Sequence, residues 1–306
     1  MVVEKSIAQS FAGAGKIRRM KRLFSPVSGR SLIVPVDDSL IFGPAAGLEQ
    51  VQFKVKQILM DPPDAVLAFP GLFRNHAELL SGVAGIVNLT ASTSRSAHTR
   101  KAQVGEVHQA AQLGLDAVAA HVNISSRYES EMLQILGSVS RECESYGMPL
   151  LGIMYPRSET ELGDNNYEEL KQRDRKQYAE LVAHSARVGV DLGVDLIKTK
   201  YTGDPESFQM VVNACKPVPI VVAGGPILPV DSMLQMAFEV IHAGGAGISF
   251  GRNVFGRDLP QPIVSALKAI VHEGVTPQEA RRHVQSDDLT GGKEQPYECQ
   301  NQTDKS

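Results

Sequence analysis

The 306-residue sequence has no tryptophan, only 6% aromatic residues and three cysteines. The cysteines, Cys143, Cys215 and Cys299, are far apart, and no CxxC pair or Cys/His metal spacing occurs. Neither a disulfide framework nor a zinc site of the usual spacing is therefore expected. This usage is typical of a reducing compartment, where cysteines serve as small apolar residues, and it favours a cytoplasmic protein.

Long apolar runs and a strong charge of one sign are also missing. No segment approaches the ~18 uninterrupted apolar residues that a membrane-spanning helix needs. Residues 1–22 lack the apolar region of a secretory signal. The formal net charge of -3 argues against a broad nucleic-acid footprint. We therefore expect neither a membrane nor a nucleic acid as partner.

What the sequence contains is a rhythm of eight short apolar runs. They are mostly continuous and rich in Val, Ile, Leu and Ala, which is typical of parallel strands buried on both faces. Amphipathic segments separate them, most clearly 128–146 and 166–191. This alternation predicts a single-domain (β/α)8 TIM barrel, with a doubly wound sheet as the main alternative. The runs lie at 32–36, 65–69, 85–89, 117–122, 149–154, 194–199, 218–223 and 246–250.

The barrel is expected over residues 31–285. Residues 1–30 are predicted to form an extension whose amphipathic helix, rich in Lys and Arg, covers one end of the domain. Contact of this basic cluster with nucleic acid or membrane is the less favoured alternative, because the run is short and the remaining chain is acidic. Residues 286–306 are polar and turn-rich, which predicts a flexible tail.

In such a barrel, functional side chains gather at the C-terminal ends of the strands. Lys198 stands near the end of the sixth run. Burial would lower the pKa of its amine and favour the free base, which can attack a ketone and form a Schiff base. From position alone, a structural lysine paired with an acid is an equal alternative. Lys200 is expected to hold an anionic substrate group or to lower the pKa of Lys198.

Polar residues also end the first and fifth runs. Tyr155 precedes Pro156, which would end the strand, and its phenol could relay protons or simply pack at the barrel mouth. Arg157 could bind an anion or pair with a carboxylate. Asp37 and Asp38 are adjacent, so in a strand they would point to opposite faces, and only one is expected to face the interior.

Glycines follow the last two runs, Gly224 and Gly225 after the seventh and Gly251 after the eighth. In (β/α)8 barrels these loops often bind phosphate through backbone N–H groups, and glycine lets the backbone approach closely. Arg252 would add a charge-assisted donor. The pattern predicts a phosphate site, whereas a P-loop is excluded because no GxxxxGK[ST] occurs.

The fourth run ends in His121 and Asn123. The eight histidines are scattered without an HxH or HxxxH pair, so no metal is expected and no cofactor is implied. His121 is predicted to be a hydrogen-bonded histidine at the mouth, and Asn123 to orient substrate hydroxyls. Without a metal, carbanion chemistry would need an amine as electron sink, which Lys198 could supply.

A set of motifs in fixed order resembles the class I aldolases of the archaeal fructose-bisphosphate aldolase type, within the deoxyribose-phosphate aldolase-like group. Within this group the sequence is most similar to the 2-amino-3,7-dideoxy-D-threo-hept-6-ulosonate synthases. Each motif is weak alone, but the set, spread from about residue 20 to 285, is specific. The motifs are VPVDD…FGP, AAHVNISS, GMPLLGIMYPR, VAHSARVGVDLGVDLIKTKYTGD, VVAGGP, GRNVFGRDLP and IVHEG.

The resemblance implies that Lys198 is the Schiff-base lysine, Tyr155 the proton-transfer tyrosine and Asp37 the catalytic aspartate. It implies a phosphorylated ketose and an aldehyde as substrates, with aspartate semialdehyde as the aldehyde in the synthases. The phosphate site and a homo-oligomer, a decameric ring, are implied in the same way. Cleavage of fructose 1,6-bisphosphate, a condensation of dihydroxyacetone phosphate with aspartate semialdehyde, and a non-catalytic phosphosugar-binding barrel are the alternatives.

Three positions depart from the family pattern. Asp38 stands where His is usual, so an anion replaces a switchable cation near the substrate. Ser39 and Ser158 stand where Gly is usual. All three are expected at the substrate mouth, which predicts altered acceptor or donor specificity.

Overall fold

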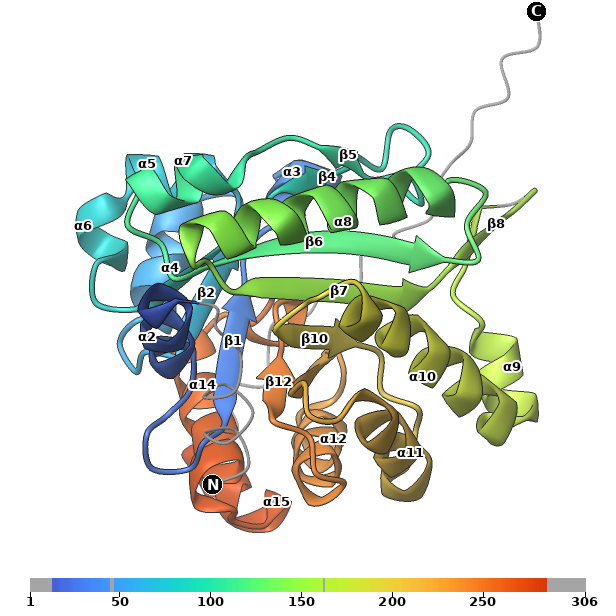
Figure 1. Ribbon diagram of the computed structural model, residues 1–306. Coiled ribbons are helices and arrows are strands. Elements are labelled where there is room, and N and C mark those ends of the chain that lie inside the picture. Colours follow the sequence, from blue (N-terminus) through green and yellow to red (C-terminus); the bar gives the residue numbers. More distant parts are fainter. Residues whose placement is uncertain (1–12, 45–46, 162, 285–306) are drawn as a thin grey trace, which may run out of the picture.

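The computed structural model describes residues 13–44, 47–161 and 163–284. Eight parallel strands close into a barrel that helices surround (Figure 1). Around the ring the order is β1-β12-β11-β10-β7-β6-β3-β2. The closed ring confirms the predicted (β/α)8 barrel and excludes the doubly wound sheet. The strands are β1 (Ser31–Pro35), β2 (Ala65–Ala68), β3 (Ala84–Asn88), β6 (Ala117–Ile124), β7 (Leu150–Pro156), β10 (Leu196–Thr199), β11 (Ile220–Ala223) and β12 (Gly247–Ser249).

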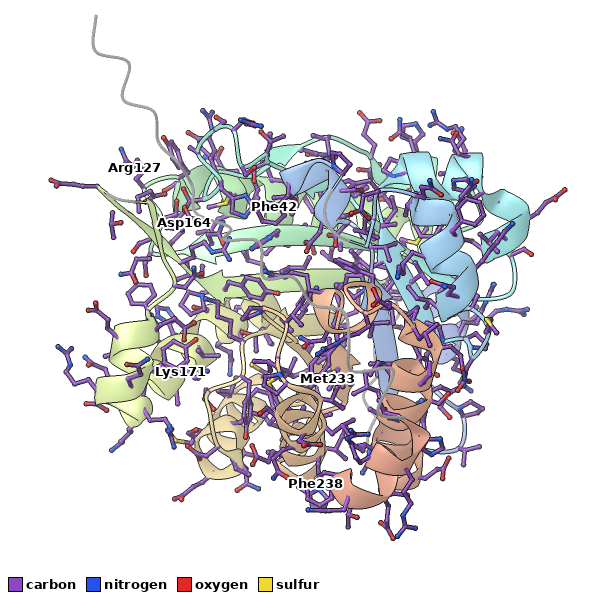
Figure 2. All side chains as sticks on the ribbon, turned by 180° about the vertical axis from the view of Figure 1, so that it is seen from behind. Phe42, Arg127, Asp164, Lys171, Met233 and Phe238 are labelled. Carbon is purple, nitrogen blue, oxygen red and sulfur yellow. The ribbon has the colours of Figure 1, made fainter. Side chains whose placement is uncertain are left out.

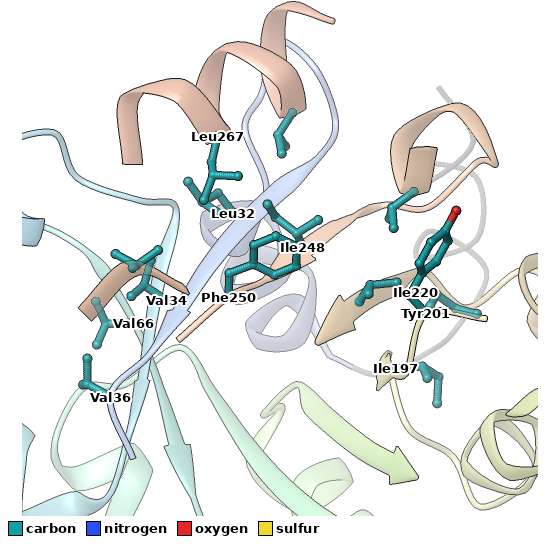
Figure 3. Packing of buried hydrophobic residues seen from close by; sticks show 14 of the residues in the cluster. Leu32, Val34, Val36, Val66, Ile197, Tyr201, Ile220, Ile248, Phe250 and Leu267 are labelled. Carbon is teal, nitrogen blue, oxygen red and sulfur yellow. The ribbon is translucent and has the colours of Figure 1, made fainter. Parts of the chain in front are cut away.

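The apolar runs are continuous because both faces of each strand are buried. In β1, Ile33 packs into the inner cluster of the barrel, whereas Leu32 and Val34 face the surrounding helices (Figure 3). Successive side chains of a strand point to opposite faces, so a strand between a packed interior and a helical layer needs apolar residues throughout. All eight predicted runs coincide with strands of the ring.

Helices on the outside cover the ring and connect its strands (Figure 1). A π-helical turn, Ala269–Glu273, continues the helix α14, and a 3-10 turn, Arg281–His283, follows α15. The helices are α2 (Ala14–Leu23), α3 (Asp38–Phe42), α4 (Val51–Ile58), α5 (Pro70–Asn75), α6 (Ala77–Leu80), α7 (Val107–Gln112), α8 (Glu129–Tyr146), α9 (Glu168–Arg173), α10 (Arg175–Asp191), α11 (Pro205–Cys215), α12 (Val230–His242), α13 (Arg252–Phe255), α14 (Pro260–Lys268) and α15 (Pro277–Ala280).

Helix α2 packs against the interior cluster of the barrel at the N-terminal end of the strands. Its Met20 and Leu23 are buried in that cluster. Lys16 is only 3% exposed and contacts Glu144 and Asp195, the latter at 3.1 Å between Nζ and Oδ2. The helix is therefore fixed both by apolar burial and by a buried cation with two carboxylate partners.

The amphipathic segment 166–191 forms two helices rather than one. Asp174 has extended backbone angles of φ -143 and ψ 86, and its side chain accepts a hydrogen bond from the backbone N–H of Gln177. It thus caps α10 and interrupts the helical rise between α9 and α10. The periodicity of the apolar residues indicated helix correctly. The break between the two helices lies at Asp174 because an aspartate side chain bonds readily to nearby backbone N–H groups and so favours a cap over a helix interior.

Two short hairpins leave the ring at the C-terminal ends of β3 and β7. They are β4–β5 (Thr90–Ala91, Ala102–Gln103) and β8–β9 (Ser158–Thr160, Gly163–Asn165). Neither was expected from the sequence, because their strands are too short and polar to give a periodic pattern. The predicted tail at 286–306 and the first part of the predicted extension lie outside the described residues. Nowhere in the described chain does a helix combine the length and apolar character needed to cross a membrane.

Candidate active site

A cavity of about 960 Å³ opens at the C-terminal ends of the strands. Eleven of the twelve predicted site residues line it, and Asn123 does not. Those eleven are Asp37, Asp38, His121, Tyr155, Arg157, Lys198, Lys200, Gly224, Gly225, Gly251 and Arg252. Residues far apart in the sequence meet there because parallel strands bring their C-terminal ends to one face.

Lys198 is the buried amine at the centre of this cavity. It lies on β10 beside Ile153 of β7 and is 7% exposed. Burial lowers the pKa of Lys198, Arg252 lowers it further, and the nearby Asp37 and Asp38 oppose the shift. Among the described residues Lys198 forms no ion pair, so the alternative of a structurally paired lysine is not what the geometry shows. The neighbouring cation that lowers the pKa of Lys198 is Arg252, whereas the sequence suggested Lys200.

Tyr155 stands beside His121 at the mouth. Their rings meet edge to face with centroids 4.9 Å apart. Burial raises the pKa of the Tyr155 phenol, so the phenol keeps its proton and can donate it. Burial also lowers the pKa of His121, with Lys101 and Arg157 adding to the shift, so the imidazole is neutral.

Asn123 lies behind His121 and outside the cavity lining. Its amide Nδ2 donates to the carbonyl of Thr99 at 2.7 Å, and its Oδ1 lies 3.0 Å from His121 Nε2. Because the amide nitrogen is already engaged, Oδ1 is the atom that accepts the Nε2–H of His121. The geometry therefore makes Asn123 a support for the histidine instead of the substrate contact that the sequence predicted.

Asp37 and Asp38 both reach the cavity, so the expectation of opposite faces is wrong. The strand ends at Pro35, and Asp37 has helical angles of φ -92 and ψ -5 before α3 begins at Asp38. Alternation holds only for extended backbone. An Asp37 oxygen accepts a hydrogen bond from Asn88 Nδ2 at 3.1 Å. Burial raises the pKa of Asp38 to about 6, although Arg252 opposes the shift.

The glycines of the last two loops lie close to other backbone. A Cβ at Gly251 would approach the carbonyl oxygen of Pro35 to 2.8 Å, and Gly225 has a φ of +69. Asn253 ties the loops together, since its Nδ2 donates to the carbonyls of Gly224 and Pro226 at 3.0 and 2.9 Å. These positions require glycine for packing and conformation. The Gly224 N–H donates to the Ser249 carbonyl at 3.3 Å, whereas Gly225 and Gly251 bring their backbone N–H groups to the cavity wall.

Arg252 carries the positive charge on this side of the mouth. Its Nε lies 3.3 Å from Oδ2 of Asp38. The residue that departs from the family pattern is thus the partner of the cation that was expected to bind phosphate. Backbone N–H groups and this guanidinium are the groups here that could hold an anion.

The β8–β9 hairpin holds two further cations. Arg157 Nε donates to Asn166 Oδ1 at 2.9 Å, and its Nη1 lies 3.8 Å from a carboxylate oxygen of Asp164. Lys200 donates to the same Asn166 oxygen at 2.9 Å. Burial lowers the pKa of Lys200 to about 7, with Arg157 adding to the shift. The sequence left Arg157 as either an anion site or an ion pair, and the structure gives it a carboxylate neighbour.

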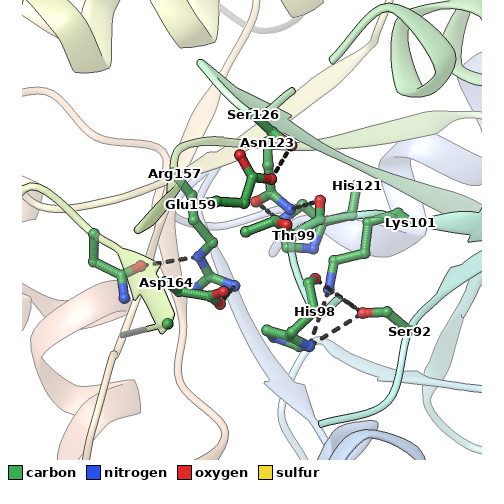
Figure 4. Close-up of polar contacts among 12 residues, drawn as sticks. Ser92, His98, Thr99, Lys101, His121, Asn123, Ser126, Arg157, Glu159 and Asp164 are labelled. Atoms are coloured by element: carbon green, nitrogen blue, oxygen red, sulfur yellow. Dashed lines mark hydrogen bonds and ion pairs between the residues drawn. The ribbon is translucent and has the colours of Figure 1, made fainter. Parts of the chain in front are cut away.

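Sequence reasoning missed polar residues at the end of β3 and after it, namely Asn88, Ser92, His98 and Lys101, which all line the cavity. Figure 4 shows the contacts among Ser92, His98 and Lys101. Lys101 is 3% exposed, and burial lowers its pKa to about 7. The signal was present, because the rule that function gathers at strand ends applies to the third run as it does to the others. Asn88 is the last residue of β3.

The cavity is more cationic than the chain as a whole. Although the formal net charge of the protein is -3, six Lys and Arg side chains line the cavity against four carboxylates. They are Lys101, Arg157, Lys171, Lys198, Lys200 and Arg252 against Asp37, Asp38, Asp164 and Glu168. The mouth therefore suits an anionic ligand. Within the described residues, no group of three or more His, Cys, Asp or Glu side chains is placed to hold a metal ion.

The chain is similar to a known family and to proteins of known name. The family described as DeoC/LacD family aldolase matches residues 31–257. A "2-amino-3,7-dideoxy-D-threo-hept-6-ulosonate synthase 1" of Archaeoglobus fulgidus is 37% identical over 271 residues, covering 88% of this chain and 95% of that protein. A "2-amino-4,5-dihydroxy-6-oxo-7-(phosphonooxy)heptanoate synthase" of Streptomyces griseus is 32% identical over 266 residues, covering 86% and 92%.

Solved structures of similar fold were also found. An archaeal fructose 1,6-bisphosphate aldolase superimposes with a TM-score of 0.75 and 26% identity, covering 85% of this chain and all of that one. An archaeal fructose-1,6-bisphosphate aldolase with its catalytic Lys covalently bound to the carbinolamine intermediate gives a TM-score of 0.73 at 26% identity, covering 84% and 99%.

Proposed function

Because the chain belongs to the DeoC/LacD family of aldolases, we propose that its barrel mouth makes and breaks carbon–carbon bonds through a Schiff base on Lys198. One observation carries this proposal. Lys198 is a buried amine with a lowered pKa and no ion-pair partner among the described residues, and it stands in a cavity that also holds Tyr155 and Asp37. Such an amine has the free base available as a nucleophile.

Imine formation would begin when Lys198 Nζ bonds to the ketone carbon. The carbonyl oxygen takes a proton from the Tyr155 phenol, and the tyrosinate then takes a proton from the new ammonium, which gives a neutral carbinolamine. Tyr155 next protonates the hydroxyl, water leaves, and an iminium cation remains. The carboxylate of Asp37 stabilises that cation, because opposite charges attract strongly in a buried site.

Carbon–carbon cleavage and formation would use the same groups. The tyrosinate takes the proton of the substrate hydroxyl, the bond between that carbon and its neighbour breaks, and the electron pair neutralises the iminium as an enamine. An aldehyde leaves. In the forward condensation the enamine attacks a new aldehyde, whose oxygen takes the proton back from Tyr155, and water then releases the product from Lys198.

For substrates, we propose a phosphorylated ketose as donor and aspartate semialdehyde as acceptor, giving an amino-heptulosonate for aromatic or aminobenzoate-type biosynthesis. The names of both relatives describe seven-carbon products with a carboxylate at carbon 1, an amino group at carbon 2 and a ketone at carbon 6. Aspartate semialdehyde would supply carbons 1 to 4. The Gly224, Gly225 and Gly251 backbone with Arg252 would hold the phosphate.

Two alternatives have specific support. Cleavage of fructose 1,6-bisphosphate is favoured by the structural neighbours. A condensation of dihydroxyacetone phosphate with aspartate semialdehyde is favoured by the relative whose product name carries a 7-phosphonooxy group. A silent phosphosugar-binding barrel is disfavoured by the joint presence of Lys198, Tyr155 and Asp37 in one cavity. A cytoplasmic homo-oligomer, a decameric ring, remains part of this proposal.

Borohydride trapping tests the Schiff base. Incubation with dihydroxyacetone phosphate or a deoxyketohexose phosphate, followed by borohydride, should leave the ketose adduct on Lys198 by peptide mass spectrometry. Lys198→Met should leave none. If wild-type protein turns over without a trapped adduct, the Schiff-base mechanism is wrong.

A product assay with each donor, with and without aspartate semialdehyde, then separates the substrates. Cleavage of fructose 1,6-bisphosphate without any use of aspartate semialdehyde would replace the preferred reaction by the aldolase alternative.

A further inference from the structure

The segment between the β4 and β5 strands places a buried cation at the cavity wall. Lys101 is only 3% exposed, and its Nζ donates to Ser92 Oγ at 2.6 Å (Figure 4). The Ser92 hydroxyl in turn donates to the His98 carbonyl at 3.0 Å, so its lone pairs face Lys101 and His98 Nδ1. One of the three N–H bonds of the Lys101 ammonium is therefore held by Ser92.

The Lys101 ammonium has no counter-ion in the described part of the chain. No carboxylate lies within ion-pair distance of it, whereas the buried Lys16 contacts two. Burial of a cation without a partner is costly, and such groups in clefts are concentrated at functional sites, where a ligand can supply the opposite charge. A second N–H bond lies near His98, whose Nδ1 is 3.5 Å from Nζ, so the third remains for that ligand in a residue that lines the cavity.

The position of Lys101 in the ring says which part of a substrate it can reach. In the closed order of eight strands, β3 is four strands from β11 in either direction. The segment that leaves β3 therefore lies across the mouth from the glycines that follow β11. A ligand that keeps its phosphate on the fragment bound to Lys198, as in the 7-phosphonooxy product, and places it at Gly224 and Gly225 would extend across Lys198 toward Lys101.

We propose that Lys101, held by Ser92 and His98, binds the carboxylate of the acceptor aldehyde and so selects anionic acceptors. This inference rests on the proposed aldol reaction and names a specificity-determining contact within it. The acceptor carboxylate would end up at carbon 1 of the product, five carbons from the ketone carbon bound to Lys198. A residue that binds this carboxylate must therefore lie at the cavity wall away from Lys198, which is where the β4–β5 segment lies.

Neighbouring groups tune this cation. Burial lowers the pKa of Lys101 to about 7, Arg157 lowers it further, and Asp164, Asp37 and Asp38 oppose the shift. His98 is neutral, since burial and Lys101 lower its pKa to about 2. A bound carboxylate favours the charged amine, so binding would draw a proton onto Lys101 near neutral pH. The charged and titratable groups that face it are His98, His121, Arg157, Asp164, Asp37 and Asp38.

The test compares two four-carbon acceptors that differ in one group. Succinic semialdehyde carries the carboxylate of aspartate semialdehyde without its amine, and butanal carries neither. With whichever phosphorylated donor the wild type uses, the ratio of kcat/KM for succinic semialdehyde to that for butanal is measured. In Lys101→Met this ratio should fall about 10- to 100-fold, the usual effect of losing a hydrogen bond to a charged group.

The matched control is Lys171→Met. Lys171 also lines the cavity but lies on α9, away from Phe42, whose ring contacts His98 (Figure 2). An equal fall of the ratio in Lys171→Met would overturn the proposal, because it would reflect the general positive potential. An unchanged ratio in Lys101→Met would also overturn it. A rise of the donor KM and of the Ki of inorganic phosphate, with the acceptor ratio unchanged, would assign Lys101 to phosphate instead.

Two further measurements keep the outcomes distinct. Borohydride trapping of the donor on Lys198 is repeated in Lys101→Met, so an intact adduct with an unchanged ratio refutes this inference alone. Absence of the adduct in wild type refutes the proposed function, and this inference falls with it.

The second measurement is the pH dependence of acceptor binding, in wild type and in a variant that keeps a charged side chain at position 101. In wild type, the KM for succinic semialdehyde relative to butanal should rise several-fold between pH 6 and pH 9, as Lys101 loses its proton. In Lys101→Arg, whose guanidinium stays charged, that rise should be flattened. A wild-type ratio that does not change over this range contradicts the proposal.

Discussion

The two ends of the barrel each bury a lysine, and they treat it in opposite ways. At the N-terminal end, burial lowers the pKa of Lys16, but Asp195 and Glu144 more than offset this, and the pKa is raised. At the C-terminal end, burial lowers the pKa of Lys198 and its carboxylate neighbours do not restore it. The same residue type is thus a charged clamp at one end and, at the other, an amine whose neutral form is favoured. Each lysine has two carboxylates nearby, but only those of Lys16 lie within ion-pair distance, and this decides the difference.

The largest effect is expected at the mouth. Lys198→Met should lower turnover by at least about 10⁴-fold, because removal of a covalent nucleophile ends the imine route. The variant should also unfold at a higher temperature, since the substitution removes a buried amine without an ion-pair partner. Turnover and thermal unfolding measured on one preparation check both. If Lys198→Met is less stable than wild type, the expected contrast with Lys16, whose loss should destabilise the protein, does not hold.

Tyr155→Phe extends the comparison to a group that is not an amine. The phenol keeps its proton because burial raises its pKa, so loss of the hydroxyl should lower kcat about 10²- to 10⁴-fold. The ring contact with His121 is kept, and stability should change little. Single-turnover imine formation is the measurement. Equal loss in His121→Phe at wild-type stability would shift the proton-transfer role to the histidine.

At the opposite end, Lys16→Met should cost stability and leave chemistry intact. The substitution leaves Glu144 and Asp195 without their cation, which should lower the free energy of unfolding by about 3 kcal/mol. Because α2 lies far from the mouth, kcat per folded molecule should stay near the wild-type value. Urea unfolding followed by titration of active sites checks this. Stability equal to wild type would show that the clamp contributes nothing.

The smallest effect is a difference in pH dependence. The folded pKa of Lys200 is lowered to about 7, so the unfolded chain binds its proton first as the pH falls from about 10 to 7, and folding stability drops over that range. Lys200→Met should reduce the difference in the free energy of unfolding between pH 7 and pH 10 by about 1–2 kcal/mol. For Lys16 the raised pKa gives the reverse sign. Its stabilising effect is lost only as the pH rises above the ordinary pKa of a lysine. Urea titrations at pH 7 and 10 compare the two variants, and equal slopes would refute the contrast.

Much of the fold could be predicted because it depends on burial alone. Continuous apolar runs indicate strands with two covered faces, and eight of them in alternation with helices closed the ring as expected. The family resemblance that the motifs indicated was confirmed by the match to residues 31–257. The barrel rule then put Lys198, Tyr155 and Arg252 at one mouth, as the structure has them.

What could not be predicted depends on local backbone turns and on irregular segments. Asp37 and Asp38 share the cavity because the strand ends at Pro35 and the backbone at Asp37 is already helical. The break at Asp174 follows from a single capping hydrogen bond. Lys101 lies in a segment with no periodic pattern, so only the topology of the ring shows that it faces the glycines across the mouth. Such placements need tertiary contacts that a pattern of apolar residues does not contain.

The two short hairpins at the mouth have a consequence for how this enzyme can diversify. Lys198 and Tyr155 stand on strands of the ring, whereas Lys101 and Asn166 stand in segments that belong to the β4–β5 and β8–β9 excursions or follow them directly. A ring strand is bonded to a neighbouring strand along both edges, whereas a hairpin at the rim can be lengthened, shortened or exchanged. Under the proposed roles, the groups that make the bond and the group that selects the acceptor therefore lie on separable pieces of chain. Exchange of the two excursions between relatives should transfer acceptor preference while the bond-making apparatus stays in place.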